Sequence, residues 1–141
     1  MPDARQFVDA NVLVYAFDKS AKAKQVIASQ LLEGLWASGV GCASVQVLQE
    51  FFVVVTRRVP EPLSIDTASE RVRELIAWNI FTPGPNDVLS AIALHKNARI
   101  NFWDAMIVHA AAEMGCEVLW TEDLADRQTV GGVAIRNPFA G

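Results

Sequence analysis

The sequence predicts an α/β fold, built as a three-layer α/β/α sandwich around a mainly parallel central sheet. Short apolar segments of strand length alternate along the chain with longer segments in which apolar residues recur at helical spacing. Such alternation favours helices that connect parallel strands. The chain has 141 residues, 52% of them hydrophobic, which suits a single domain over residues 1–141 with one buried core.

Five short segments are typical of buried strands. The first ends on the carboxylate of Asp9, and the third is closed by Pro83, Gly84 and Pro85. The expected strands are residues 6–9, 40–43, 80–82, 117–120 and 133–135. Right-handed crossovers bring the carboxyl ends of parallel strands to one edge, so a functional site is expected at that edge.

Six longer segments are predicted to be helical. Ser44 is a favourable N-cap for the third, and Gly39 and Gly115 end the second and the last. The expected helices are residues 11–17, 21–38, 45–58, 64–78, 86–94 and 102–114. Core positions are expected at Val26, Ile27, Leu31, Leu32, Leu35, Ile76, Trp36, Trp78, Trp103 and Trp120, with stacking on a nucleic-acid base as the alternative for Trp103.

Composition excludes some classes of protein. Charged residues make up only 20% of the chain, which argues against disorder. The first six residues lack the apolar run of a signal peptide, and the longest apolar runs are too short to cross a bilayer. Cys42 and Cys116 show no metal-type spacing and are expected to be buried, reduced thiols. We therefore expect a cytoplasmic protein.

Four acidic residues are expected to meet at the carboxyl edge of the sheet. Asp9 ends the first strand, Asp123 follows the fourth, and Asp104 lies in the first turn of the last helix. Glu50 lies in the middle of an apolar helix, where an unpaired carboxylate is costly to bury. Read singly, these acids could cap helices, occupy turns or pair with an arginine, so the prediction depends on their convergence.

Oxygen ligands of this kind suit Mg²⁺ or Mn²⁺. Such an ion orients a water molecule, lowers its pKa and neutralises charge on a scissile phosphate, which predicts hydrolysis of a phosphodiester without an enzyme nucleophile. The net charge of −4 speaks against a nucleic-acid partner. That objection weakens where several acids share a divalent ion, because the ion itself attracts phosphate.

Four segments of the chain resemble the motifs of PIN domains, and in particular of the VapC-like toxin ribonucleases of type II toxin–antitoxin pairs. They are FVDANVLVYA at 7–16, SVQVLQEF at 44–51, FWDAMIV at 102–108 and WTEDL at 120–124. The resemblance implies a PIN-like α/β/α sandwich that cleaves RNA endonucleolytically with Mg²⁺ or Mn²⁺. It also implies a homodimer and inhibition by a cognate antitoxin protein.

By this resemblance, Asp9, Glu50 and Asp104 would form the core of the metal site and Asp123 would complete it. Asn11, Ser44 and Thr121 would orient the acids or the metal-bound waters by hydrogen bonds without touching the metal. They also suit the roles of turn residue, helix N-cap and strand-end hydroxyl. Two nearby acids, Glu122 and Asp126, are rivals of Asp123. Strand parity favours Asp123, because side chains two residues apart share a face and Thr121 would then point into the site.

Other functions fit the same residues. A nuclease of the same fold could process RNA or act on DNA, and a catalytically inactive binding module could use the acids only structurally. A phosphatase with Asp9 as nucleophile is less favoured, because Asn occupies position 11 where a second Asp would be expected. Basic residues that could line an RNA groove are Arg57, Arg58, Arg71, Arg73, Lys96, Arg99 and Arg127, of which Arg99 is closest in sequence to Asp104.

Overall fold

The computed structural model describes residues 4–140 and has a six-stranded sheet at its centre. The strands are β1 (Gln6–Val8), β2 (Gly41–Ser44), β3 (Asn79–Phe81), β4 (Val118–Trp120), β5 (Thr129–Val130) and β6 (Val133–Arg136). Their order is β3-β2-β1-β4-β6-β5, and every pairing is parallel except that of β5 with β6. The mainly parallel sheet is confirmed, and β5 is an additional strand that the sequence did not predict.

Helices connect the strands as predicted. They are α1 (Ala10–Phe17), α2 (Ala23–Ser38), α3 (Val45–Arg57), α4 (Ile65–Leu75), α5 (Pro85–Ala98) and α6 (Phe102–Glu113), with a 3₁₀ turn η1 (Lys19–Ala21) before α2. Gly39 ends α2 with a left-handed φ of 74°, and the Ser44 hydroxyl caps α3 by accepting from the Val47 N–H at 3.3 Å. Helix α5 runs four residues beyond its expected end at Leu94.

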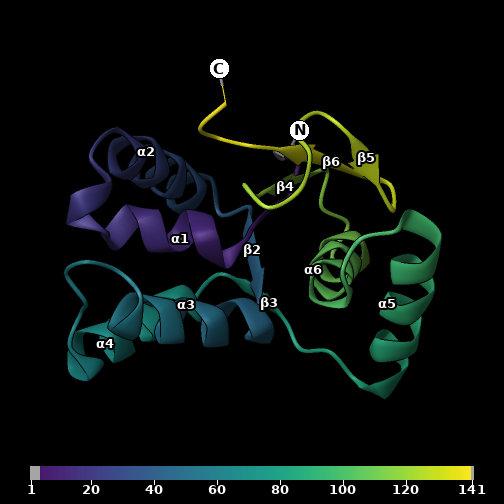
Figure 1. Cartoon of the computed structure of the whole chain (residues 1–141), viewed down its shortest axis with the longest axis horizontal. Helices are drawn as coiled ribbons and strands as arrows, with labels where there is room; N and C mark the ends of the chain where they lie inside the picture. Colours follow the sequence, from purple (N-terminus) through teal and green to yellow (C-terminus); the bar gives the residue numbers. More distant parts are fainter. Residues whose placement is uncertain (1–3, 141) are drawn as a thin grey trace.

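The helices form a layer on each side of the sheet. Figure 1 shows α1 to α4 on one side and α5 with α6 on the other. This division follows from right-handed crossovers, because the chain moves outward from β1 through β2 to β3 and then returns to β4 on the opposite side of β1. The reversal of direction places the switch point of the sheet between β1 and β4, where α/β folds form their binding crevices.

Apolar side chains from the sheet and both helical layers fill the core. Among the largest fully buried side chains are Phe7 and Leu119 on the central strands, Leu13 on α1 and Phe51 on α3. Phe17 packs against Phe51 with ring centroids 5.6 Å apart and the rings steeply inclined. A rigid core therefore lies directly beneath the carboxyl ends of β1 and β4.

Several core predictions are wrong. The exposed fractions are 56% for Val26, 37% for Ile27, 44% for Trp36 and 58% for Ile76, and Trp103 has the highest value of the five, 64%. Leu32 and Leu35 of α2 are buried as predicted, together with Ala28. Ile76 is the C-cap residue of α4 and is exposed, although Leu75 before it and Trp78 after it are buried.

The structure also bears on the predictions for the cysteines, for membrane-spanning helices and for the first residues of the chain. Cys42 and Cys116 are free and buried, as expected. Residues 4–140 contain no helix long and apolar enough to cross a membrane. The first three residues, which belong to the segment considered for a signal peptide, lie outside the described residues.

Candidate active site

Asp9 is the most deeply buried of the four predicted acids. It follows β1 directly, its backbone N–H donates to the Trp120 carbonyl at 2.9 Å, and only 4% of the residue is exposed. One carboxylate oxygen accepts from the Ala10 N–H at 2.7 Å, which caps α1. The other accepts from the Thr121 hydroxyl at 2.8 Å. Asp9 is therefore held firmly at the switch point of the sheet.

Thr121 joins the ends of the two central strands. While its hydroxyl donates to Asp9, it accepts from the Asn11 side-chain N–H₂ at 3.3 Å and from the Asp123 backbone N–H at 3.1 Å. A hydroxyl has one donor and two acceptor sites, so Thr121 uses all three. This geometry fits the supporting role predicted for Asn11 and Thr121.

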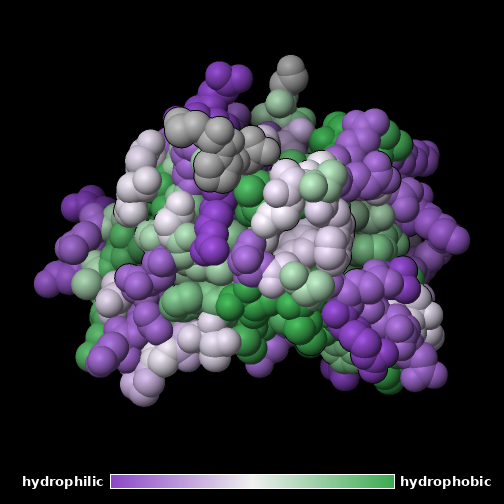
Figure 2. Space-filling view, turned by 180° about the vertical axis from the view of Figure 1, so that it is seen from behind, coloured by the Kyte–Doolittle hydropathy of each residue, from purple (hydrophilic) through white to green (hydrophobic). Residues whose placement is uncertain are grey.

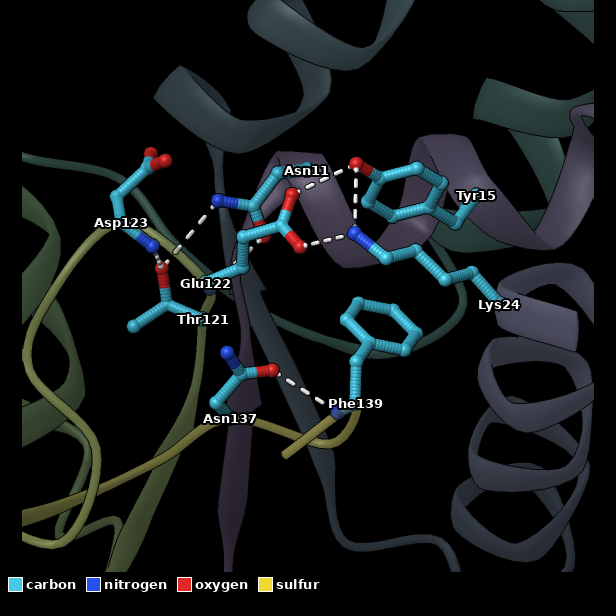
Figure 3. Close-up of polar contacts among 8 residues, drawn as sticks. All are labelled: Asn11, Tyr15, Lys24, Thr121, Glu122, Asp123, Asn137 and Phe139. Carbon is cyan, nitrogen blue, oxygen red and sulfur yellow. Dashed lines mark hydrogen bonds and ion pairs between the residues drawn. The ribbon is translucent and has the colours of Figure 1, made fainter. Parts of the chain in front are cut away.

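Glu122 and Asp123 turn in opposite directions after β4. Figure 3 shows the Glu122 carboxylate directed toward Tyr15 and Lys24, while the Asp123 carboxylate points away from them. Glu122 accepts from the Tyr15 hydroxyl and from the Lys24 ammonium, both at 2.7 Å. Both of its oxygens are thereby engaged away from Asp9.

The Asp126 carboxylate also has other partners. It accepts from the Asn137 N–H at 2.8 Å and lies 3.7 Å from the Arg127 guanidinium. Asp123 is therefore the acid of this loop that shares a cavity with Asp9, in agreement with strand parity.

Glu50 approaches from α3, on one side of the sheet. It is half-buried, and one of its oxygens accepts from the Gln46 side-chain N–H₂ at 3.0 Å. The same amide group donates to the backbone carbonyl of Trp103 at 3.3 Å. Gln46 thus links Glu50 to the start of α6 in the opposite layer.

Asp104 approaches from the first turn of α6. Its backbone N–H donates to the Asn101 side-chain carbonyl at 2.8 Å, and one of its carboxylate oxygens accepts from the Asn101 N–H₂ at 2.9 Å. This reciprocal cap fixes the side chain at a helix N-terminus, where the dipole favours a negative charge.

The four acids line one cavity of 230 Å³, which we call the acid cavity. Its other walls are Gln46, Asn101, Trp103 and Ile107, so it contains no Lys or Arg. A second cavity of 510 Å³, the side cavity, shares Asp9, Glu50 and Asp123 with it and extends between α1 and α3 to Asp18 and Arg58. The acids therefore lie where two hollows meet.

Burial and the charges of neighbouring acids disfavour the charged forms of Asp9 and Asp104. Burial raises the pKa of Asp9 to about 7, opposed by the hydrogen bonds from Thr121 and Ala10 and reinforced by the charges of Asp123 and Glu50. Burial also raises the pKa of Asp104, with Asp123 and Glu50 adding to the effect. No salt bridge in the described part of the chain involves any of the four acids.

These carboxylates fit a divalent cation by the chemistry of their donors. All are oxygen ligands, they face one cavity, and nothing within that cavity neutralises them. Across residues 4–140, no group of three or more Asp, Glu, His or Cys side chains is already arranged as a metal-holding set. A cation would favour the charged forms of Asp9 and Asp104, whose pKa values are raised by burial and, to a lesser extent, by the neighbouring acids.

Some predicted residues have other positions. Ser44 lines neither cavity, and its hydroxyl serves as the N-cap of α3. Arg99 occupies the left-handed C-cap of α5, with φ 56°, and lines neither cavity, whereas Arg58 lines the side cavity. Trp103 is exposed at the rim of the acid cavity, which favours the stacking alternative over the core prediction.

Sequence reasoning missed Gln46 and Asn101. Gln46 lies one helical turn before Glu50, and Asn101 lies at the N-cap three residues before Asp104. Both spacings were visible in the sequence, because residues three and four apart on a helix are neighbours.

Fold and site together define a class of protein: an α/β domain with a carboxylate cluster at the switch point of a parallel sheet. The family model described as PIN domain matches residues 7–128, and the chain belongs to this family. We found no curated protein that matches the chain.

Solved structures of toxin–antitoxin proteins share the fold. The toxin–antitoxin complex from Klebsiella pneumoniae is 21% identical, with a TM-score of 0.70 over 95% of this chain and 98% of that one. VapBC2 from Rickettsia felis, bound to a promoter DNA fragment, is 17% identical, with a TM-score of 0.67 over 94% and 97%. VapC20 from Mycobacterium tuberculosis, a sarcin-ricin loop cleaving toxin, is 17% identical, with a TM-score of 0.64 over 84% and 89%.

Proposed function

We propose that this protein is a Mg²⁺- or Mn²⁺-dependent endoribonuclease and the toxin of a type II toxin–antitoxin pair. One observation carries the catalytic part of the proposal. Four carboxylates from two strand ends and both helical layers line a single cavity that contains no basic residue. Such an arrangement is costly for the folded chain unless a cation joins it.

Asp9, Glu50 and Asp104 would hold the metal ion, and Asp123 would complete the site. When bound, the ion supplies an activated water and neutralises charge on the scissile phosphate. Thr121 keeps the Asp9 carboxylate oriented through its hydroxyl. Asn101 and Gln46 do the same for Asp104 and Glu50.

The surroundings of the acids support a single-stranded RNA substrate. Trp103 is 64% exposed at the rim of the acid cavity and offers an aromatic face on which a base can stack. On the opposite side, Arg58 lines the side cavity and offers a cation for a phosphate of the same strand. VapC20, whose fold this chain shares, is a sarcin-ricin loop cleaving toxin.

The toxin role rests on the solved toxin–antitoxin complexes of the same fold. A cognate antitoxin protein is therefore the proposed inhibitor, and the cytoplasm, which holds both RNA and antitoxin, is the proposed location.

We also propose a homodimer. Figure 2 shows apolar side chains gathered in the lower middle of the face seen from behind. An apolar groove of 380 Å³ between α3 and α4, lined mainly by Leu48, Phe52 and Val72, supports association of two copies.

RNA cleavage by three purified variants tests the catalytic proposal. Asp9→Asn and Asp104→Asn should each abolish cleavage of a labelled RNA in Mg²⁺ or Mn²⁺, whereas Glu61→Gln, on an exposed loop, should cleave like the parent. Circular dichroism verifies that each variant is folded. Undiminished cleavage by both active-site variants would refute the assignment, and cleavage of DNA in place of RNA would favour the alternative substrate.

A further inference from the structure

Glu122 lies outside the acid cavity and is bound on both oxygens by residues of α1 and α2. Lys24 of α2 forms an ion pair with one oxygen at 2.7 Å, and the Tyr15 hydroxyl of α1 donates to the other, also at 2.7 Å. Lys24 also donates to the Tyr15 hydroxyl at 3.4 Å. Both oxygens of Glu122 are therefore anchored on the side of α1 and α2.

Aromatic rings cover this ion pair. The Lys24 ammonium lies 4.7 Å from the centroid of the Tyr15 ring and 5.1 Å from that of Phe139. The two rings meet edge to face, with centroids 5.0 Å apart. Asn137 accepts from the Phe139 N–H at 2.9 Å and shapes the C-terminal turn that brings Phe139 there. Figure 3 shows these side chains gathered beside Glu122.

The loop that carries Asp123 has little backbone support, although Leu124 packs against the core and the Asp126 carboxylate accepts from the Asn137 N–H. Strand β4 ends at Trp120, and the last ladder-type bond runs from the Thr121 N–H to the Arg136 carbonyl at 3.0 Å. Within residues 4–140, residues 122–126 take part in no backbone–backbone hydrogen bond. The loop is held by side chains: Asn11 accepts from the Glu122 N–H at 3.4 Å, and Thr121 accepts from the Asp123 N–H.

We propose that Lys24 is a positioning residue for the acid cavity: together with Tyr15 it anchors Glu122 and thereby directs the adjoining Asp123 toward the other acids. Both oxygens of Glu122 are held toward α1 and α2, which restrains the adjoining peptide, and the Asp123 side chain lines the acid cavity. The inference deepens the proposed function and rests on it, since it assigns the control of one acid of the same site.

The direction of the change in cation affinity distinguishes a positioning role of Lys24 from a general effect of its charge. Loss of a positive charge near an acidic site makes its potential more negative, which strengthens the binding of a cation. Loss of a positioning contact weakens it, typically by 10- to 100-fold for residues that orient metal ligands, and about tenfold is expected for Lys24 because it acts through Glu122.

Calorimetric titration of the full chain with Mn²⁺ tests the proposal. Lys24→Met should weaken Mn²⁺ binding about tenfold, and Lys24→Arg should restore most of it because a guanidinium still pairs with Glu122. Lys19→Met, which removes an exposed lysine of η1 near Lys24 in sequence, is the matched control and should bind as well as the parent or better. Melting temperatures verify the fold of each variant.

A double-mutant cycle identifies the route of the effect. If Lys24 acts through Asp123, then Lys24→Met should change Mn²⁺ affinity in the parent and have little further effect in an Asp123→Asn background. Equal losses in the two backgrounds would overturn the positioning role, as would Mn²⁺ binding by Lys24→Met that equals or exceeds that of the parent.

The two proposals can fail separately. A parent that binds Mn²⁺ but cleaves no RNA would overturn the proposed function and leave the role of Lys24 intact, provided that the calorimetric result holds. A parent that cleaves RNA while Lys24→Met binds Mn²⁺ normally would overturn the role of Lys24 alone. A parent that binds no Mn²⁺ would overturn both.

Discussion

Replacing Asp9 by Asn should stabilise the metal-free protein while destroying its response to divalent metal. Asn has nearly the same shape as Asp and still accepts from the Ala10 N–H, but it carries no charge into the buried site. The parent must either bury the charge of Asp9 or hold a proton there, because burial raises the pKa of this group to about 7.

The magnitude follows from the shift in pKa. A rise from 3.8 to about 7 corresponds at most to about 4 kcal/mol at alkaline pH, at 1.36 kcal/mol per unit. This shift already includes the hydrogen bond from Thr121. The variant, however, places an amide N–H₂ where a carboxylate oxygen accepted from a buried partner, which costs about 1–3 kcal/mol. We therefore expect the variant to be about 1–3 kcal/mol more stable than the parent at pH 8 in a chelator.

The pH dependence has a definite sign. The folded parent binds the Asp9 proton more tightly than the unfolded chain does, so the contribution of Asp9 to stability is most favourable below pH 3.8 and becomes less favourable as the pH rises to about 7. The stability difference between variant and parent should thus grow across this range and level off above it. Mg²⁺ should raise the stability of the parent and leave that of the variant nearly unchanged.

Urea unfolding in EDTA from pH 4 to pH 8 measures this difference, with Glu61→Gln as a control for the loss of an exposed charge. The reasoning would be refuted if Asp9→Asn were no more stable than the parent at pH 8. A stability difference that does not vary with pH would refute it equally.

Three further changes test other parts of the account. Trp103→Ala should raise the KM for RNA about tenfold with little change in kcat, because base stacking contributes about 1–3 kcal/mol; an unchanged KM in steady-state kinetics would contradict it. Ser44→Ala should lower the free energy of unfolding by about 1 kcal/mol through loss of the α3 cap, as measured in urea, and equal stability would argue against that cap. Gly41→Ala should destabilise by about 1–3 kcal/mol, because its Cβ would lie 2.9 Å from the Trp78 ring; Gly34→Ala, in open space on α2, is its control and should not destabilise.

The alternation of strands and helices could be predicted because strands and helices each have their own spacing of apolar residues. Asp9 and Asp123 could be placed at one edge, since both follow strands that must be parallel if helices connect them. Strand β5 could not be predicted, because two residues show no alternation. It pairs with β6 only after a tight turn at Gly131 and Gly132, whose φ angles are 56° and 83°.

The buried face of each helix was predicted less well than the helix itself, because the spacing of apolar residues does not show which other element covers the helix. Val26 and Ile27 have the right spacing in α2 but no partner in the described chain that covers them. Trp103 was predicted to be a core residue from its apolar neighbours, yet position two of α6 faces outward over the acid cavity.

The choice among the acids of residues 122–126 depended on contacts distant in sequence. Parity favoured Asp123, but the pairing of Glu122 with Lys24 joins residues 98 positions apart. No local pattern shows such a contact. The structure was needed to see that Glu122 is occupied elsewhere, and with it the network that supports Asp123.

The central claim is that the four carboxylates form a site for a divalent metal ion. Anomalous diffraction from crystals soaked in Mn²⁺ tests this most directly. We predict a strong anomalous peak in the acid cavity, within bonding distance of carboxylate oxygens of Asp9, Glu50 and Asp104. A saturating soak that gives no peak there, or a peak bound only to other residues, would contradict the account.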